Sequence, residues 1–217
     1  YPYINSSVQI TRVEVWITNR NSITDNVRNI VAIQDLGETN PENSSIDDFY
    51  NGFFISNPNS YPSNNSNILD PSQIGTNGVL NNSIRDIASV KEGFGVLSSV
   101  VIEGRDYSVL ESARKLNENE YNLNNQLGYI SLRQSLNNDE VIAVAFQYTV
   151  NGKTYQVGEF SSDGVPATTV SNSSSDINSV NNNSLVLKML KSSVLDVSQP
   201  VWNLMMKNIY NCLLYTS

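Results

Sequence analysis

Residues 141–160 read Val-Ile-Ala-Val-Ala-Phe-Gln-Tyr-Thr-Val-Asn-Gly-Lys-Thr-Tyr-Gln-Val-Gly-Glu-Phe, and this stretch predicts a β-hairpin. The Asn151-Gly152 pair favours a type I′ turn, because both central residues of that turn need positive φ. Apolar residues alternate along the first arm, and near its start the opposite face is apolar as well. A strand with two apolar faces is covered on both sides, so we expect this arm to lie inside a β-rich domain.

The same alternation extends to both sides of the hairpin. Residues 8–18 predict a long strand in which the apolar positions change from even (Val8, Ile10) to odd (Val13 onward), which indicates a β-bulge near Thr11. Further strands are predicted at 28–33, 95–102, 107–110, 127–132 and 185–190.

Two helices are predicted. Ser83 can cap a short helix that ends at Gly93. Pro200 suits the first position of a second helix, in which Trp202, Met205, Met206 and Ile209 share an apolar face.

These elements predict a fold that is mainly β with a few short helices (α+β), built from antiparallel sheets and hairpins in a sandwich-like arrangement. We expect a β-rich domain over 1–164 with an Asn/Ser-rich loop insertion at 39–82, then a Ser/Asn-rich linker or loop at 165–184, and a strand and the start of the next helix at 185–211. Residues 212–217 match one reading frame of a common sequencing-library adapter, so we interpret them as an artefact at the end of an internal fragment.

Composition excludes several classes of function. The chain has 13 Lys+Arg against 21 Asp+Glu, a formal charge of −8, and it carries no basic cluster suited to nucleic acid. It has no His, which removes Ser-His-Asp triads and His-ligated zinc, and the single Cys212 forms neither an internal disulfide nor a thiolate metal cluster. The 32 Asn and 30 Ser make the chain polar without making it highly charged.

The motifs that could carry chemistry are weak. Asp47/Asp48 and Asp139/Glu140 are adjacent carboxylates, which point to opposite faces of a strand and do not converge on one substrate. The Asx-rich stretch 40–51 offers oxygen ligands for calcium without the EF-hand order, and residues 93–95 lack the third glycine of a phosphate-binding loop. We therefore expect no catalytic, cofactor-binding or metal-binding residues, no cofactor, and no enzymatic activity.

Long strings of the sequence carry a family resemblance. They are Thr11-Arg-Val-Glu-Val-Trp-Ile-Thr-Asn-Arg20, Val27-Arg-Asn-Ile-Val-Ala-Ile-Gln-Asp-Leu-Gly-Glu38, Leu127-Gly-Tyr-Ile-Ser-Leu132, the hairpin strings Glu140-Val-Ile-Ala-Val-Ala-Phe-Gln-Tyr-Thr149 and Tyr155-Gln-Val-Gly-Glu-Phe160, and Pro200-Val-Trp-Asn-Leu-Met-Met-Lys-Asn-Ile-Tyr210. These strings resemble the SprA/Sov family, the outer-membrane translocon of the Bacteroidetes type IX secretion system, which is linked to gliding motility, and the resemblance covers most of 10–38, 84–160 and 185–211.

The resemblance implies a non-catalytic segment of a very large β-barrel that passes folded proteins across the outer membrane. Its implied partners are secreted cargo proteins and other secretion-system subunits, with membrane attachment through the full-length barrel and a location at the outer membrane or cell surface. We expect this segment to be an extramembrane domain, because Arg12 and Glu14 lie in its longest strand and polar loops flank the strands. A cell-surface adhesin or carbohydrate-binding β-domain is the alternative, which the Asn/Ser content and 11 Tyr also permit.

Overall fold

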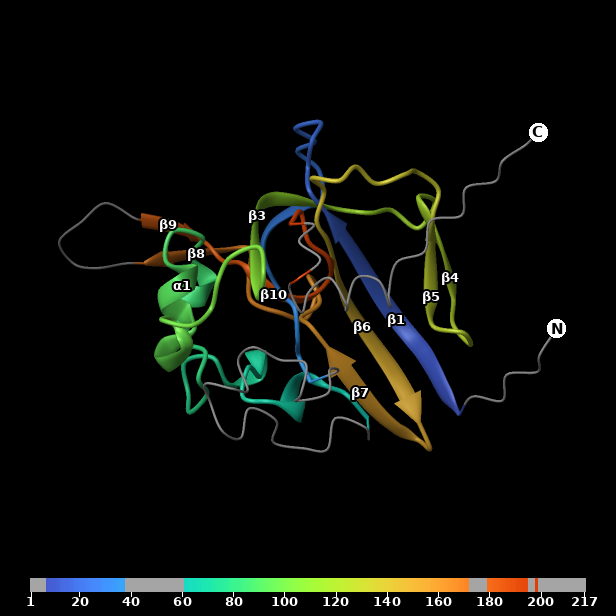
Figure 1. Ribbon diagram of the computed structural model, residues 1–217, viewed down its shortest axis with the longest axis horizontal. Helices are drawn as coiled ribbons and strands as arrows, with labels where there is room; N and C mark the ends of the chain where they lie inside the picture. Colours follow the sequence, from blue (N-terminus) through green and yellow to red (C-terminus); the bar gives the residue numbers. More distant parts are fainter. Residues whose placement is uncertain (1–6, 38–60, 172–178, 195–197, 199–217) are drawn as a thin grey trace.

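Five strands close into a ring in the computed structural model, which describes residues 7–37, 61–171, 179–194 and 198. Around the ring each strand pairs with the next and the last pairs with the first, in the order β1 (Val8–Ile17), β3 (Tyr107–Lys115), β2 (Val27–Ile33), β10 (Leu185–Lys191) and β6 (Ile142–Val150). Strand β7 (Lys153–Val157) continues β6 as a hairpin (Figure 1). The ring is a small β-barrel.

The pairings are unequal in length. Strand β1 pairs with β6 over its whole length, whereas it pairs with β3 only through Trp16 and Ile17. All pairs in the ring are antiparallel except β2 with β10, which run parallel. Strand β10 thus sits between β2 and β6 and closes the barrel opposite its weakest seam, the short contact between β1 and β3.

The barrel interior is filled by side chains from all five strands. Alanines alternate with large apolar residues, which suits a ring this narrow. The buried interior set is Trp16, Ile30, Ala32, Leu110, Ala113, Val141, Ala143, Ala145, Phe160, Leu185, Leu187 and Met189.

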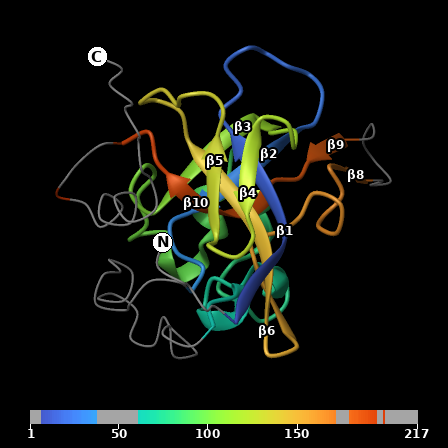
Figure 2. The same cartoon turned by 90° about the vertical axis from the view of Figure 1, so that its right-hand side faces the viewer.

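Two layers cover the outer face of the barrel. The hairpin of β4 (Tyr121–Asn124) and β5 (Tyr129–Leu132) packs over β1 and β6, in front of them in Figure 2. The segment from Leu69 to Val101 packs over β2, β3, β7 and β10. Short helices build this second cover: η3 (Pro71–Gln73), η4 (Asn82–Arg85), α1 (Val90–Gly93) and η5 (Gly95–Leu97). The short helix η2 (Asn64–Ser66) precedes it.

A two-stranded ribbon, β8 (Thr168–Ser171) with β9 (Ser179–Asn182), projects from the barrel on the left of Figure 1. It lies within the range 165–184, for which a linker or loop was expected. Among the described residues, no helix is both long enough and apolar enough to cross a membrane.

The predicted fold class, mainly β with a few short helices and antiparallel sheets, is confirmed, although the sheet closes into a barrel where a sandwich-like arrangement was expected. Several local predictions are confirmed as well. The β1–β6 register shifts between Ile10 and Arg12, which places a bulge at Thr11. Asn151 and Gly152 both have positive φ, at 50° and 78°. The start of β6 is buried on both faces, with Ala143 inside the barrel and Ile142 beneath the β4–β5 hairpin.

Two local predictions are wrong. Residues 95–102 form no strand: they begin with η5 and continue through turns, and Leu97 and Val101 are buried while Val96 and Ile102 are 63% and 52% exposed. The predicted helix from Ser83 is divided into η4, which Asn81 caps, and α1.

Several sequence-based expectations concern parts of the chain outside the described residues. These are the Asp47/Asp48 pair, the Asx-rich stretch 40–51, the helix from Pro200 and the hexapeptide 212–217. Of the expected insertion 39–82, residues 61–82 are described, and Leu69 and Leu80 belong to the core.

We predict that a chain ending after Gly164 does not unfold cooperatively, whereas a chain ending after Val194 does. The shorter chain lacks β10, whose Leu185, Val186 and Leu187 are 0% exposed and whose backbone pairs on both edges. Thermal unfolding followed by circular dichroism makes the comparison. A cooperative transition of the shorter chain at the temperature of the longer one would show that β10 is dispensable.

Candidate functional site

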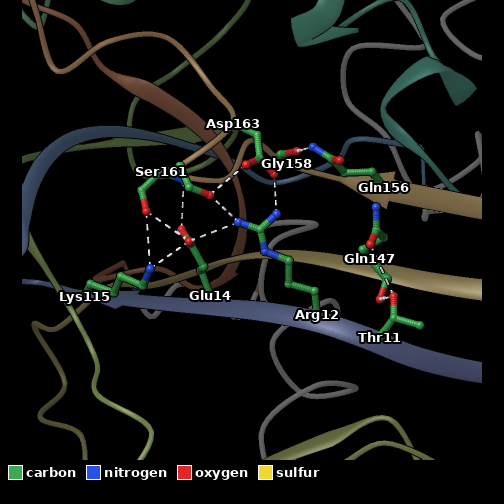
Figure 3. A network of polar contacts seen from close by, with 10 residues as sticks. Thr11, Arg12, Glu14, Lys115, Gln147, Gln156, Gly158, Ser161 and Asp163 are labelled. Atoms are coloured by element: carbon green, nitrogen blue, oxygen red, sulfur yellow. Dashed lines mark hydrogen bonds and ion pairs between the residues drawn. The ribbon is translucent and has the colours of Figure 1, made fainter.

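A cluster of charged side chains lies where β1 and β3 separate, and we call it the seam cluster: Arg12, Glu14, Lys115, Ser161 and Asp163 (Figure 3). After the bulge at Thr11, Arg12, Glu14 and Trp16 share the face of β1 that points toward the barrel interior. Backbone pairing between β1 and β3 involves only Trp16 and Ile17, so side chains connect the strands beyond it.

Glu14 is the centre of the seam cluster, with a side chain that is 5% exposed. Its Oε1 accepts hydrogen bonds from Lys115 Nζ at 2.7 Å and Ser161 Oγ at 2.9 Å, and its Oε2 accepts one from the Ser161 N–H at 2.9 Å. Burial by itself would raise the pKa of Glu14, but these hydrogen bonds and the Lys115 charge outweigh it and hold the pKa below 4.5. Glu14 is therefore ionised at neutral pH, and both of its carboxylate oxygens accept hydrogen bonds.

Arg12 joins the cluster to the loop that follows β7. Its guanidinium donates to Asp163 and Ser162, lies 3.8 Å from Glu14 Oε1, and stacks 3.8 Å from the centroid of the Phe160 ring. The hydrogen bond from Arg12 lowers the pKa of the exposed Asp163. The loop is thus fixed to β1 by one cation.

A second ion pair fixes the same loop to the cover and to β10. Arg85 binds Glu159 through two hydrogen bonds of 2.5 and 2.7 Å, and both side chains are nearly buried, at 11% and 12% exposed. Glu159 Oε2 also accepts the Val186 N–H at 2.8 Å. The loop 158–163 therefore connects β1, β3, β10 and the helical cover.

The predicted carboxylate pair does not form a site. Asp139 is exposed and lies 3.1 Å from Arg20, whereas Glu140 is buried and its Oε2 accepts the Asn137 N–H at 2.6 Å. Phe94, between the two glycines of 93–95, is buried in the core. Within the described ranges, no three His, Cys, Asp or Glu side chains are placed to hold a metal ion.

An open groove of about 360 Å³ lies on the outer face of β1 and β6, between the two covering layers. We call it the tyrosine groove. Val8, Ile10, Phe146 and Tyr148 form its floor, residues 61–62 form one wall, and residues 125–128 form the other.

Sequence reasoning identified neither the seam cluster nor the tyrosine groove. The alternation of Arg12, Glu14 and Trp16 was a usable signal for the cluster, because it places two charges on the face that buries a tryptophan. The groove has no such signal, since Tyr61 and Tyr148 are 87 positions apart and meet only in the fold.

The sequence profile of a family described as motility related/secretion protein, SprA_N, matches residues 1–156. The chain belongs to this family. The SprA_N match includes four strands of the barrel and ends before β10, which completes the ring. The membership confirms the resemblance read from the sequence, and it makes the chain a motility- or secretion-related protein. A search of curated proteins found no match.

We predict that Glu14→Gln lowers the free energy of unfolding by about 1–3 kcal/mol near neutral pH, because it weakens charged hydrogen bonds in a buried position. The folded pKa of Glu14 lies below its ordinary value of 4.5, so this stabilisation is complete above that value and is lost as the pH falls through the folded pKa. The difference between the two proteins should therefore shrink in acid.

Urea unfolding at neutral and acidic pH measures this difference. Asp139→Asn is the matched control: its pair with Arg20 is exposed, and its loss should change stability by less than about 0.5 kcal/mol. A Glu14→Gln effect as small as that of the control would mean that the seam cluster does not hold the barrel together.

Proposed function

We propose that this chain is a non-catalytic, extramembrane segment of an outer-membrane protein translocon, of the type IX secretion system that is linked to gliding motility. The observation that carries the proposal is the match of residues 1–156 to a family of motility related/secretion proteins. The long strings shared with the SprA/Sov translocon supply the finer assignment.

The state of the buried charges supports a non-catalytic role. Glu14 accepts three hydrogen bonds and Glu159 is held by Arg85 and by the backbone of β10. A general acid or base needs a pKa near the working pH, whereas the pKa of Glu14 lies below 4.5. These carboxylates stabilise the barrel and its connecting loop.

Two features of the barrel support a place outside the bilayer. The β4–β5 hairpin and the segment 69–101 pack on its outer face. Its interior is filled by apolar side chains, among them Trp16 and Met189. The domain therefore has a packed interior, and we propose that it shapes or covers the exit path. The large barrel of the full-length protein would provide the membrane anchor and the channel. Its partners would be secreted cargo proteins and other subunits of the secretion system at the outer membrane or cell surface.

We predict that Leu187→Asp in the full-length protein abolishes cargo secretion while Val170→Asp preserves it. Leu187 is 0% exposed inside the barrel, where an unpaired carboxylate costs several kcal/mol, whereas Val170 is 56% exposed on the projecting ribbon. The measurement is the amount of cargo in the culture medium, with the amount of translocon in the outer membrane as a control.

A second variant tests whether cargo secretion needs the carboxylates that could catalyse a reaction. The Asp139→Asn/Glu140→Gln double variant removes the predicted carboxylate pair and should secrete cargo at the normal level. Normal secretion by the Leu187→Asp variant, or loss of secretion by the carboxylate variant at normal protein level, would contradict the proposal.

A further inference from the structure

The tyrosine groove is a strip of sheet that neither covering layer reaches. Its floor comes from β1 and β6, whose outer faces are elsewhere buried under the β4–β5 hairpin. Tyr61 and Leu127, on opposite walls, are 38% and 48% exposed, so apolar side chains border an opening to solvent. Exposed apolar surface that gathers in one groove marks a binding site more often than scattered residues do.

Tyr61, Phe146 and Tyr148 line the groove, and Tyr155 of β7, which is not a lining residue, joins Tyr61 to Tyr148 in a row of aromatic rings. The ring centroids of Tyr61 and Tyr155 lie 5.3 Å apart, those of Tyr155 and Tyr148 lie 5.3 Å apart, and those of Tyr148 and Phe146 lie 6.0 Å apart. Tyr148 is fixed further, because its hydroxyl donates to the Pro62 carbonyl. The Tyr148 ring is therefore held in place by protein contacts before any ligand binds.

The opposite wall carries two side-chain amides beside Leu127. It presents Asn125 and Gln126, both exposed, on the turn between β4 and β5, and the Ile10 N–H holds this turn against β1 by bonding the Asn125 carbonyl at 3.2 Å. Among the residues that the structure describes, none that lines the groove carries a charge, although the whole chain has a net charge of −8.

We propose that the tyrosine groove binds a neutral oligosaccharide. Aromatic rings provide flat faces for the C–H surfaces of sugar rings, and side-chain amides provide both donors and acceptors for sugar hydroxyls. The groove volume of about 360 Å³ lies within the range of small-ligand sites. An acyl chain would leave the amide wall without partners and would stay exposed in an open groove, and a charged ligand would meet no counter-charge.

The inference does not depend on the proposed function, because a purified chain tests it without any secretion assay. The probes are the neutral hexasaccharides of glucose, mannose and N-acetylglucosamine, with oligogalacturonate as the acidic comparison. Isothermal titration calorimetry of the whole chain should show binding of at least one neutral probe and none of the acidic one.

Variants locate the site. Tyr61→Ala should weaken binding about tenfold or more, the effect of losing one stacked ring, whereas Tyr61→Phe should retain most of the affinity because it keeps the ring. Gln126→Ala should weaken binding about fivefold or more, the loss of one polar contact in the site. Tyr129→Ala is the matched control, since Tyr129 is a 52% exposed tyrosine on β5 that does not line the groove.

Thermal unfolding of each variant checks that the fold is kept. The proposal is overturned if no neutral hexasaccharide binds at millimolar concentration, or if Tyr61→Ala binds as tightly as Tyr129→Ala. It is overturned equally if the groove takes only an apolar peptide or a fatty acid, tested as a valine-rich decapeptide and as laurate.

Discussion

Backbone hydrogen bonds on both edges of β10 hold this strand between β2 and β6, and the closed barrel depends on that placement. Leu185, Leu187 and Met189 of β10 pack against interior residues from the other four strands. Without them the interior would contain mostly alanines on the side of β6, which cannot fill it.

Two buried lysines of β10 restrict how the strand can sit. Lys188 Nζ donates to the Gln34 carbonyl, and Lys191 Nζ donates to the carbonyls of Asn138 and Glu140 at 2.8 and 2.7 Å. Burial lowers the pKa of Lys191, and the nearby charges of Glu140 and Asp139 offset part of that shift. A slip of one residue would turn Lys188 into the apolar interior of the barrel, so the buried lysines help to specify the register of β10.

The sequence predicted the hairpin, the bulge and most strands because each depends on neighbours in the chain. Asn151 and Gly152 determine their turn locally. Around Thr11 the apolar residues change from even to odd positions, and this change indicates the bulge. Residues 95–102 have the apolar content of a strand, but Gly95 has a φ of +57° and lies close to the Val79 carbonyl, so a turn begins there instead.

What could not be predicted depends on distant pairings. No local pattern predicts that the barrel closes through only two paired positions of β1 and β3. Nor does any local pattern predict that β10 pairs parallel with β2. The seam cluster joins Glu14 to Ser161, and the tyrosine groove joins Val8 to Tyr148, so both exist only after the barrel has formed. The family resemblance, by contrast, was readable from long strings of the sequence, and the SprA_N match over residues 1–156 confirms it.

The parallel pairing of β2 with β10 also determines when the barrel can form during synthesis. Ile30 pairs with Leu185, a partner 155 positions later in the chain. Until β10 has been synthesised, the edges of β2 and β6 that pair with it therefore lack their partner. Such long-range closure is slow, and open strand edges attract other chains. The nascent domain therefore presents open strand edges to other chains until β10 has been synthesised.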